Sequence, residues 1–377
     1  MMSRRSLLHL VVLVVVFGIL TRSWVVSLVP TTNAMDRFTP PDEKQRRSAI
    51  GSTAGLQPRM LRAFDPADHF EPIPAPGPSD WLAKHPEPGQ TFAQYRQERV
   101  NRPDKIRRKL YLQPLGDFPA DTSPSLEQLK QFAEAFFTLP VELRPAVDLA
   151  GLPITSRMHP GAGQRQLLTS DILVWLQTRL PKDAYCILAI TMADLYPADD
   201  WSFVFGQASL RERVGVYSFA RYDPAFYGEK RGDDYRAVIQ RRSAKVMIHE
   251  AVHMFGIEHC IFYRCILNGS NHLIEADSRP LILCPVCLRK LQRSCGFDPI
   301  ERYRALLGFY RGRAGFEEEA RWIERRLGKI APPGEGKAPP QAPAPAAPKG
   351  GAKTSAKDSG KDSAKDSAKD SAKNPSR

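Results

Sequence analysis

Histidine and cysteine are scarce in this chain, and the few that it has are gathered in one region. The 377 residues include eight histidines and six cysteines. Five of the cysteines lie within residues 260–295, and four of the histidines lie within residues 249–272. A disulfide framework would distribute its cysteines through a chain of this length, so the clustering points to metal ligation.

The chain also has fewer acidic than basic residues, and it lacks any Lys/Arg run with interleaved aromatic residues. Its formal net charge is +13, of which residues 331–377 contribute +4. A nucleic-acid-binding surface would need such a run to follow a phosphate backbone. We interpret the remaining charge as scattered, solvated surface charge, and we expect no nucleic-acid partner.

Large apolar residues are almost absent from residues 331–377. This segment is rich in Pro, Ala and Gly and then repeats Lys-Asp-Ser-Ala. Such a composition cannot repay the entropy of folding, so we predict a disordered tail. A plain solvated tail is the favoured interpretation, and a spacer or an adhesive for anionic envelope polymers is the alternative.

Long apolar runs are confined to the N-terminal segment. Arg4 and Arg5 precede the run LLHLVVLVVVFGIL at residues 7–20. We predict that residues 1–34 are a targeting segment, either a cleaved signal peptide or an uncleaved membrane anchor. The order of charge and apolar run predicts export of the rest of the chain, to a membrane-anchored, periplasmic or extracellular location. The stretch SRRSLL also resembles a twin-arginine signal.

The sequence predicts one ordered domain over residues 101–330. Before it, the Pro/Arg-rich composition of residues 35–100 predicts an extended linker that wraps the surface. Apolar runs predict strands at residues 110–115 and 184–196 and two more within 201–222. Helical periodicity predicts helices over residues 123–139 (capped by Ser123), 164–180, 233–255 and 298–328. The mixture of elements predicts an α+β fold.

The stretch HEAVHMFGIEH, residues 249–259, is the most specific motif in the sequence. On a helix, His249 and His253 lie on the same face and present two imidazoles to one point. Gly256 lets the helix end and the chain turn back, so that His259 becomes the third ligand. Three protein ligands leave the fourth position of a zinc ion open, which is typical of a catalytic site, and zinc lowers the pKa of its water from ~16 to roughly 7. Glu250 is then placed to take the proton as general base.

Four of the cysteines form two short-spaced pairs: Cys260 with Cys265, and Cys284 with Cys287. This spacing predicts a second, structural zinc with four thiolate ligands. Because Cys260 directly follows His259, that zinc would also fix the third ligand of the first. Two disulfides in an exported protein are the alternative. Cys186 is interpreted as a core thiol, and Cys295 has no assigned partner.

The whole stretch HEAVHMFGIEHCIFYRCILNGSNHLIEADSRPLILCPVC, with LAITMADLYP and FVFGQASLRERVGVYSFARY, resembles the archaemetzincin family of zinc metallopeptidases over most of residues 80–330. The resemblance implies a metzincin-like fold: a twisted mixed sheet over an active-site helix, with a smaller C-terminal helical subdomain. It implies zinc ligation by the three histidines, a second zinc on the four cysteines, and Glu250 as the base. Leu267 stands where the family usually has a methionine. Asn271 and His272 match a family stretch and either line the cleft or form a hydrogen-bonded structural pair.

From these observations we predict a monomeric zinc-dependent metallopeptidase with two Zn²⁺ per chain, acting on peptide or protein substrates. An extended substrate could add as a strand to the sheet edge within residues 201–222. Endopeptidase and aminopeptidase activity both remain open. The alternative is a non-catalytic or weakly active zinc-stabilised peptide-binding module at the cell envelope. The intact Glu250 argues against it, because a binding module needs no base at that position.

Overall fold

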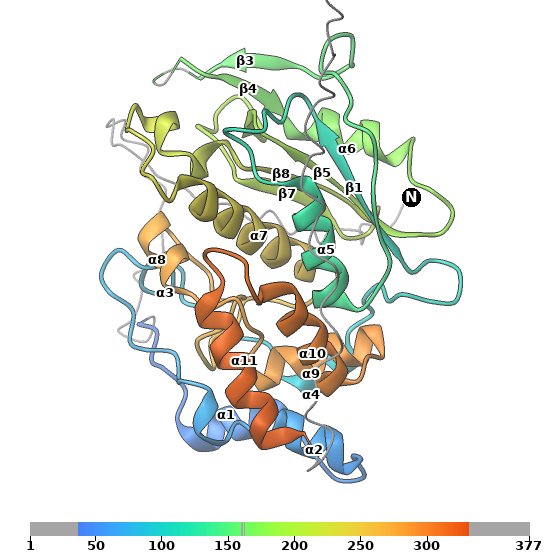
Figure 1. The fold of residues 1–377 in the computed structure, drawn as a ribbon, viewed down its shortest axis with the longest axis vertical. Coiled ribbons are helices and arrows are strands. Elements are labelled where there is room, and N and C mark those ends of the chain that lie inside the picture. Colours follow the sequence, from blue (N-terminus) through green and yellow to red (C-terminus); the bar gives the residue numbers. More distant parts are fainter. Residues whose placement is uncertain (1–36, 160, 162, 332–377) are drawn as a thin grey trace, which may run out of the picture. The chain divides into compact units, whose positions relative to one another are not determined.

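The computed structural model describes residues 37–159, 161 and 163–331 (Figure 1). The predicted leader and nearly all of the predicted tail lie outside these residues. Within the described part of the chain, no helix combines the length and the apolar character that a membrane crossing requires.

The main sheet has five strands in the order β2-β1-β5-β8-β7. They are β2 (Val141–Leu143), β1 (Lys109–Leu115), β5 (Ala184–Thr191), β8 (Val214–Ser218) and β7 (Gly206–Ser209). The first four run parallel, and β7 pairs antiparallel with β8 at the edge. The strands predicted at residues 110–115 and within 201–222 are confirmed.

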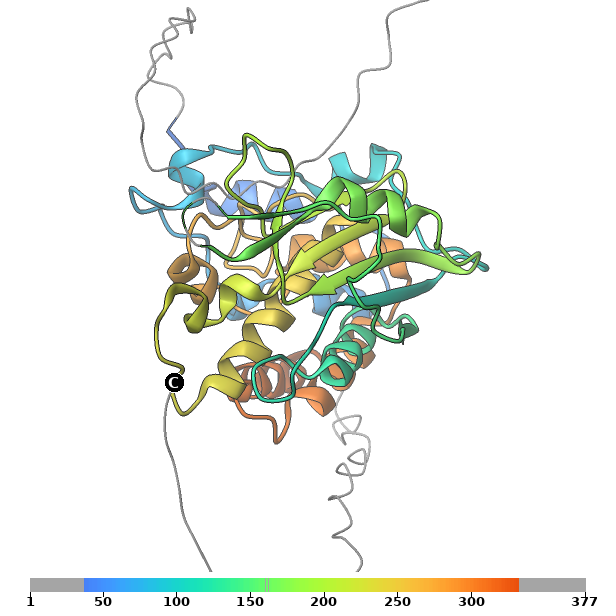
Figure 2. The same ribbon diagram turned by 90° about the horizontal axis from the view of Figure 1, so that it is seen from above.

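Helices cover both faces of this sheet, which explains why β5 is apolar along its whole length. Leu188 and Ile190 pack into a core with α5 (Leu126–Phe137) and α7 (Tyr235–His253). Ile187 and Ala189, which point the other way, pack into a second core with α6 (Thr169–Gln177). Figures 1 and 2 show the sheet between α6 on one side and α7 on the other.

A small second sheet corrects two of the predicted elements. Its strands are β3 (Ser156–Met158), β4 (Arg165–Leu168) and β6 (Asp194–Tyr196). The predicted helix over residues 164–180 therefore begins only at Thr169, because residues 165–167 pair with β3 and residues 166–168 pair with β6. The predicted strand over 184–196 is two strands, separated by a turn in which Thr191 Oγ1 accepts from Ala193 N. The helix predicted from residue 123 begins at Leu126, and Ser125 rather than Ser123 caps it.

Residues 37–100 differ from the extended linker that the sequence predicted. They form α1 (Glu43–Ile50), α2 (Pro58–Phe64), the 3₁₀ turn η1 (Ala67–His69), α3 (Trp81–Lys84) and α4 (Phe92–Gln97). Asp42 and Thr91 each close a capping box at a helix start, and Pro58 occupies a first helical position. The turn-forming residues that suggested a linker therefore begin helices whose apolar side chains are mostly buried, with the exposed Leu61 as an exception.

The N-terminal helices pack with the C-terminal helices in a second layer. This layer contains α9 (Pro285–Cys295), α10 (Pro299–Tyr310) and α11 (Glu317–Ile330), and Figure 1 shows α1 and α2 beside them. The remaining elements are η2 (Ala220–Tyr222), η3 (Pro224–Tyr227) and α8 (Leu273–Ser278). Helix α7 lies between the sheet and this layer, and its residues 243–253 are all buried. The predicted motif therefore lies at the centre of a mixed α/β fold.

Candidate active site and metal centres

The structure brings the three predicted histidine ligands together. His249 and His253 lie on the last turn of α7, and His259 lies on the loop that follows. The Nε2 atoms of His249 and His253 are 3.2 Å apart, and one ring nitrogen of each of the three histidines lies within 4.8 Å of the others. All three side chains are buried.

Gly256 makes the turn between helix and loop, as the sequence predicted. Its φ of 72° lies in the left-handed region. A Cβ at this position would lie 2.2 Å from Val100 Cγ1, so no larger residue fits without a shift. The chain can therefore reverse there and return His259 towards the helix.

Hydrogen bonds fix the tautomer of each imidazole. Each Nδ1 lies beside an oxygen that can only accept: Ile266 O at 2.8 Å for His249, Ile257 O at 2.6 Å for His253, and Glu87 Oε1 at 2.8 Å for His259. Each Nδ1 must therefore carry the proton, which leaves the Nε2 lone pairs free. Within the described residues, the buried His259 Nε2 has no hydrogen-bond partner. Three neutral imidazoles with supported Nδ1–H groups are the donor set that zinc requires.

The electrostatics of the site keep His249 and His253 neutral and perturb Glu250. Burial lowers the pKa of His253 to about 3 and lowers that of His249 well below its usual value. Burial raises the pKa of Glu250 to about 8, although the charge of Arg279 opposes this shift. A dication at the three nitrogens would favour the ionised carboxylate. Within the described residues, no group donates a hydrogen bond to Glu250, so its oxygens are available to a reactant.

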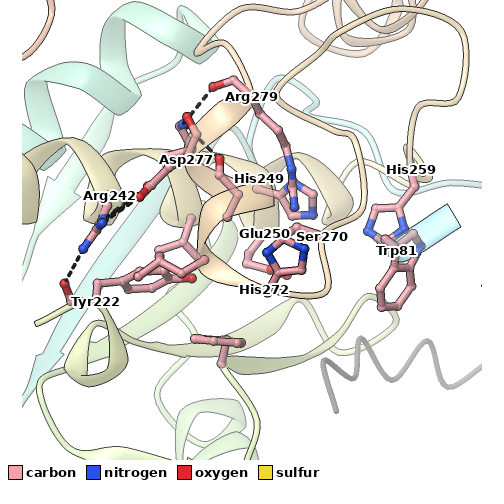
Figure 3. A pocket seen from close by; sticks show the side chains of 15 residues that line it. Trp81, Tyr222, Arg242, His249, Glu250, His259, Ser270, His272, Asp277 and Arg279 are labelled. Atoms are coloured by element: carbon pink, nitrogen blue, oxygen red, sulfur yellow. Dashed lines mark hydrogen bonds and ion pairs between the residues drawn. The ribbon is translucent and has the colours of Figure 1, made fainter. Parts of the chain in front are cut away.

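A pocket opens beside the histidines, and Figure 3 shows the side chains that surround it. Trp81 and His259 lie on one side, Tyr222 and Arg242 on the other, with His249 and Glu250 between them. The indole of Trp81 packs edge-on against His259, with ring centroids 5.3 Å apart. Motif reasoning did not identify Trp81 or Glu87, because the residues before 101 carry no catalytic signature.

His272 combines the two roles that the sequence left open, whereas Asn271 makes only the structural hydrogen bonds. His272 lines the pocket, and its Nε2 lies 3.1 Å from Asp80 Oδ1. Asn271 Nδ2 donates to Ser79 O at 2.9 Å. The backbone N–H of Trp81 donates to Glu275. These contacts hold the segment that carries Trp81 against α8.

The four predicted cysteine ligands are buried together, with their sulfur atoms within 4.8 Å of one another. Cys260 Sγ and Cys284 Sγ are 3.5 Å apart, and both are free thiols rather than a disulfide. Burial alone would raise the pKa of Cys260, but contacts with the other three sulfurs lower it. Burial and sulfur contacts raise the pKa of Cys284. Four thiolates would need a cation to neutralise them, and this donor set fits tetrahedral zinc. Cys186 is buried in β5, as predicted.

The loop that follows Cys265 connects the cysteine cluster to the histidine cluster by hydrogen bonds. Cys260 N donates to Leu267 O at 2.8 Å, and Ile266 N donates to Ile282 O at 2.8 Å. Ile266 O in turn lies beside His249 Nδ1. The sequence predicted one connection, from Cys260 to His259, and the structure adds this second one. Leu267 is fully buried in the turn.

Comparison with known proteins reveals similar chains. The model of Peptidase family M54 matches residues 172–293. The chain is 40% identical to archaemetzincin-2 of Homo sapiens over 282 residues, which cover 67% of this chain and 78% of that protein. It is 35% identical to archaemetzincin-1 of Homo sapiens over 298 residues, which cover 68% of this chain and 60% of that protein. Among solved structures, an archaemetzincin from Methanopyrus kandleri is 24% identical with a TM-score of 0.40, covering 52% of this chain and 99% of that one.

Proposed function

The chain belongs to the archaemetzincin family of metallopeptidases, and on this premise we propose that it hydrolyses peptide bonds at the three-histidine cluster, with Glu250 as general base. One zinc ion would be held there by the Nε2 atoms of His249, His253 and His259. The observation that carries the proposal is the convergence of three unprotonated imidazole nitrogens beside a carboxylate that accepts no hydrogen bond from the described residues.

Zinc bound to these nitrogens supplies a water of lowered pKa and a positive charge that polarises the scissile carbonyl. Glu250 accepts the proton of the attacking water and passes it to the leaving amine. Its pKa of about 8 before metal binding shows how strongly the site is desolvated, and desolvation strengthens every charge interaction within it. The carbonyls of Ile257 and Ile266 and the carboxylate of Glu87 keep the imidazoles oriented.

The edge of the main sheet gives the substrate a place to bind. β7 is the edge strand, and Phe205, directly before it, lines the pocket. An extended peptide that pairs with β7 would place one of its side chains in the pocket next to Glu250. This arrangement supports a peptide or protein substrate.

We also propose a second, structural zinc on Cys260, Cys265, Cys284 and Cys287. Their burial and mutual proximity support it, as does the hydrogen-bonded loop that joins them to His249. The mixed sheet beside α7 and the C-terminal helices support the metzincin-like fold that the sequence resemblance implies.

The deciding experiment compares peptide hydrolysis by the wild type and Glu250→Gln at equal zinc occupancy, measured across varied peptides. We expect the variant to be slower by about 10²–10⁴-fold, the usual contribution of a general base. If both proteins are equally inert while zinc content is full, the chain is a zinc-stabilised peptide-binding module instead.

Export of the protein through residues 1–34 and a monomeric state are further parts of the proposal, supported by the sequence alone. N-terminal sequencing of the protein recovered from its native cells distinguishes a cleaved signal from a retained anchor. Light scattering of the purified protein tests the monomer.

A further inference from the structure

Arg279 is a buried cation, and two of its three guanidinium nitrogens have no hydrogen-bond partner within the described residues. The residue follows α8, and its exposed fraction is 8%. Its Nε and Nη2 atoms are buried, and neither has a hydrogen-bond acceptor within the described residues. Burial lowers the pKa of Arg279 only to about 10, so the group is charged at neutral pH. A buried charge without a directly bonded counter-ion is unfavourable and therefore requires an explanation.

The carboxylates around Arg279 are already occupied. Asp277 pairs with Arg242 at 2.6 Å. Glu275 accepts from the backbone N–H groups of Trp81 and Asn271. Glu250 attracts Arg279 through space but makes no hydrogen bond with it, and the proposed function assigns this carboxylate to proton transfer.

A second cation increases the positive charge of the same region. Lys245 also lines the pocket, and its ammonium donates to three backbone carbonyls: Ala276 O, Asp277 O and Arg279 O. These carbonyls are dipoles and carry no net charge. Burial lowers the pKa of Lys245 to about 7, so its charge is only partly present at neutral pH, and the unpaired positive charge of the pocket is chiefly that of Arg279. A dication at the histidines would add to this charge.

The guanidinium is also in the right place to meet a substrate. Arg279 is one of the residues that line the pocket, as Figure 3 shows, and its positive charge acts on both His249 and Glu250. Apolar side chains, among them Trp81, Phe205 and Leu273, form much of the remaining lining. Such walls exclude water and strengthen a charge–charge interaction inside the pocket.

We propose that Arg279 binds a carboxylate of the peptide substrate, so that the enzyme selects peptides which place an acidic group in this pocket. A guanidinium offers a planar fork of N–H donors that matches a carboxylate in two parallel hydrogen bonds. The carboxylate can come from an Asp or Glu side chain or from a free C-terminus, which present the same chemistry. This inference rests on the proposed peptidase function and adds a substrate class to it.

The test uses matched peptide pairs and the zinc-loaded protein. In one arm, Glu and Gln are exchanged at each position around the cleaved bond; in the other, a free C-terminus is exchanged for an amide. We expect the acid member of one arm to be cleaved with a kcat/KM about tenfold or more above its neutral partner, since tenfold corresponds to about 1.4 kcal/mol. The arm that shows the preference identifies the source of the carboxylate.

Three variants assign the preference to Arg279. Arg279→Gln removes the charge but keeps polar atoms at this buried position, whereas Arg279→Met removes both. Because the two variants place different demands on the buried position, at least one of them is expected to fold. In either folded variant the acid-to-neutral ratio should fall to about one. Arg311→Gln is the matched control, because Arg311 pairs with Glu324 on the surface of the C-terminal helices. It should keep the wild-type ratio.

The failure of this inference is distinguishable from the failure of the proposed function. Equal kcat/KM for acid and neutral peptides, or a preference that survives in Arg279→Met, overturns the role of Arg279 while hydrolysis continues. If no peptide is cleaved, fluorescence anisotropy of the same labelled peptides still decides the question. Tighter binding of the acid peptides by the wild type but not by Arg279→Met supports the inference, and equal binding overturns it.

Discussion

Glu87 should control the affinity of the three-histidine cluster for zinc, although it lies 172 residues before His259 in the chain. Its Oε1 accepts from His259 Nδ1 at 2.8 Å and from the Trp81 indole Nε1 at 2.6 Å. Burial would raise the pKa of Glu87, but these hydrogen bonds hold the pKa below its usual value, so the group is a carboxylate at neutral pH. The substitution Glu87→Gln keeps the shape and removes the charge.

The expected effect follows from the difference between a charged and a neutral acceptor. Hydrogen bonds to charged groups contribute about 1.5–3 kcal/mol, and those between neutral groups about 1 kcal/mol. Replacing the carboxylate by an amide should therefore weaken the support of His259 by roughly 0.5–2 kcal/mol. Partners of metal-ligating histidines typically change metal affinity by about 10–100-fold, and the two ranges meet near tenfold, so we expect a loss of about tenfold.

Competition with a chelator of known affinity measures this loss for each zinc separately. The histidine-bound zinc should leave Glu87→Gln at a lower chelator concentration than the wild type, while the cysteine-bound zinc is unchanged. Glu71→Gln is the matched control from the same N-terminal segment, because the Glu71 side chain is largely exposed. Equal affinity of the histidine cluster in wild type and Glu87→Gln would refute the reasoning.

Four further predictions concern the motif and its surroundings. Cys284→Ser should lose one of two zinc ions and keep the other in elemental analysis, whereas two ions per chain in the variant would contradict a four-cysteine site. In chelator-treated protein, Glu250→Gln should raise the melting temperature at pH 8 but hardly at pH 4.5. Burial raises the pKa of Glu250 to about 8 in the folded state, whereas its value in the unfolded state is 4.5. The wild type therefore loses stability as the pH rises from 4.5 towards 8, and the neutral glutamine of the variant does not. Gly256→Ala should lower the free energy of unfolding in urea by at least about 1–2 kcal/mol, because its φ is 72° and Val100 Cγ1 would lie 2.2 Å from the new Cβ. Leu267→Met, a volume-conserving change in a buried turn, should alter that free energy by less than about 1.5 kcal/mol, and a larger change in urea titration would show that the turn depends on leucine.

The parts of the site that the sequence predicted are those encoded by local spacing. His249 and His253 converge because they are one helical turn apart, and His259 follows because Gly256 allows the chain to reverse. The paired cysteines could be grouped for the same reason, since short spacing limits how far apart two side chains can lie. The central strand was predictable because helices cover it on both faces, which makes its sequence apolar throughout.

The parts that the sequence did not predict depend on contacts between distant segments. Nothing in the residues around Glu87 or Arg279 distinguishes them from surface charges. Only the fold brings the half-buried Glu87 to His259 and buries Arg279 in the lining of the pocket. Residues 165–168 have helical periodicity, yet they form a strand between β3 and β6, because tertiary pairing outweighs a weak local preference. The helices within residues 37–100 are short, and their stability comes from packing rather than from periodicity.

The support of the three imidazoles shows why these distant segments matter to the chemistry. The acceptor for His253 lies on the loop directly after α7, the acceptor for His249 lies on the loop between the cysteines, and the acceptor for His259 is Glu87 from the N-terminal segment. The same N-terminal segment holds the turn after α7, since Gln90 Nε2 donates to Gly256 O at 3.1 Å. Each histidine is thus oriented by a different part of the chain. Residues 37–100 therefore contribute contacts to the candidate active site rather than forming only a linker before it. A protein reduced to residues 101–330 would keep every residue of the motif while losing the support of its third histidine.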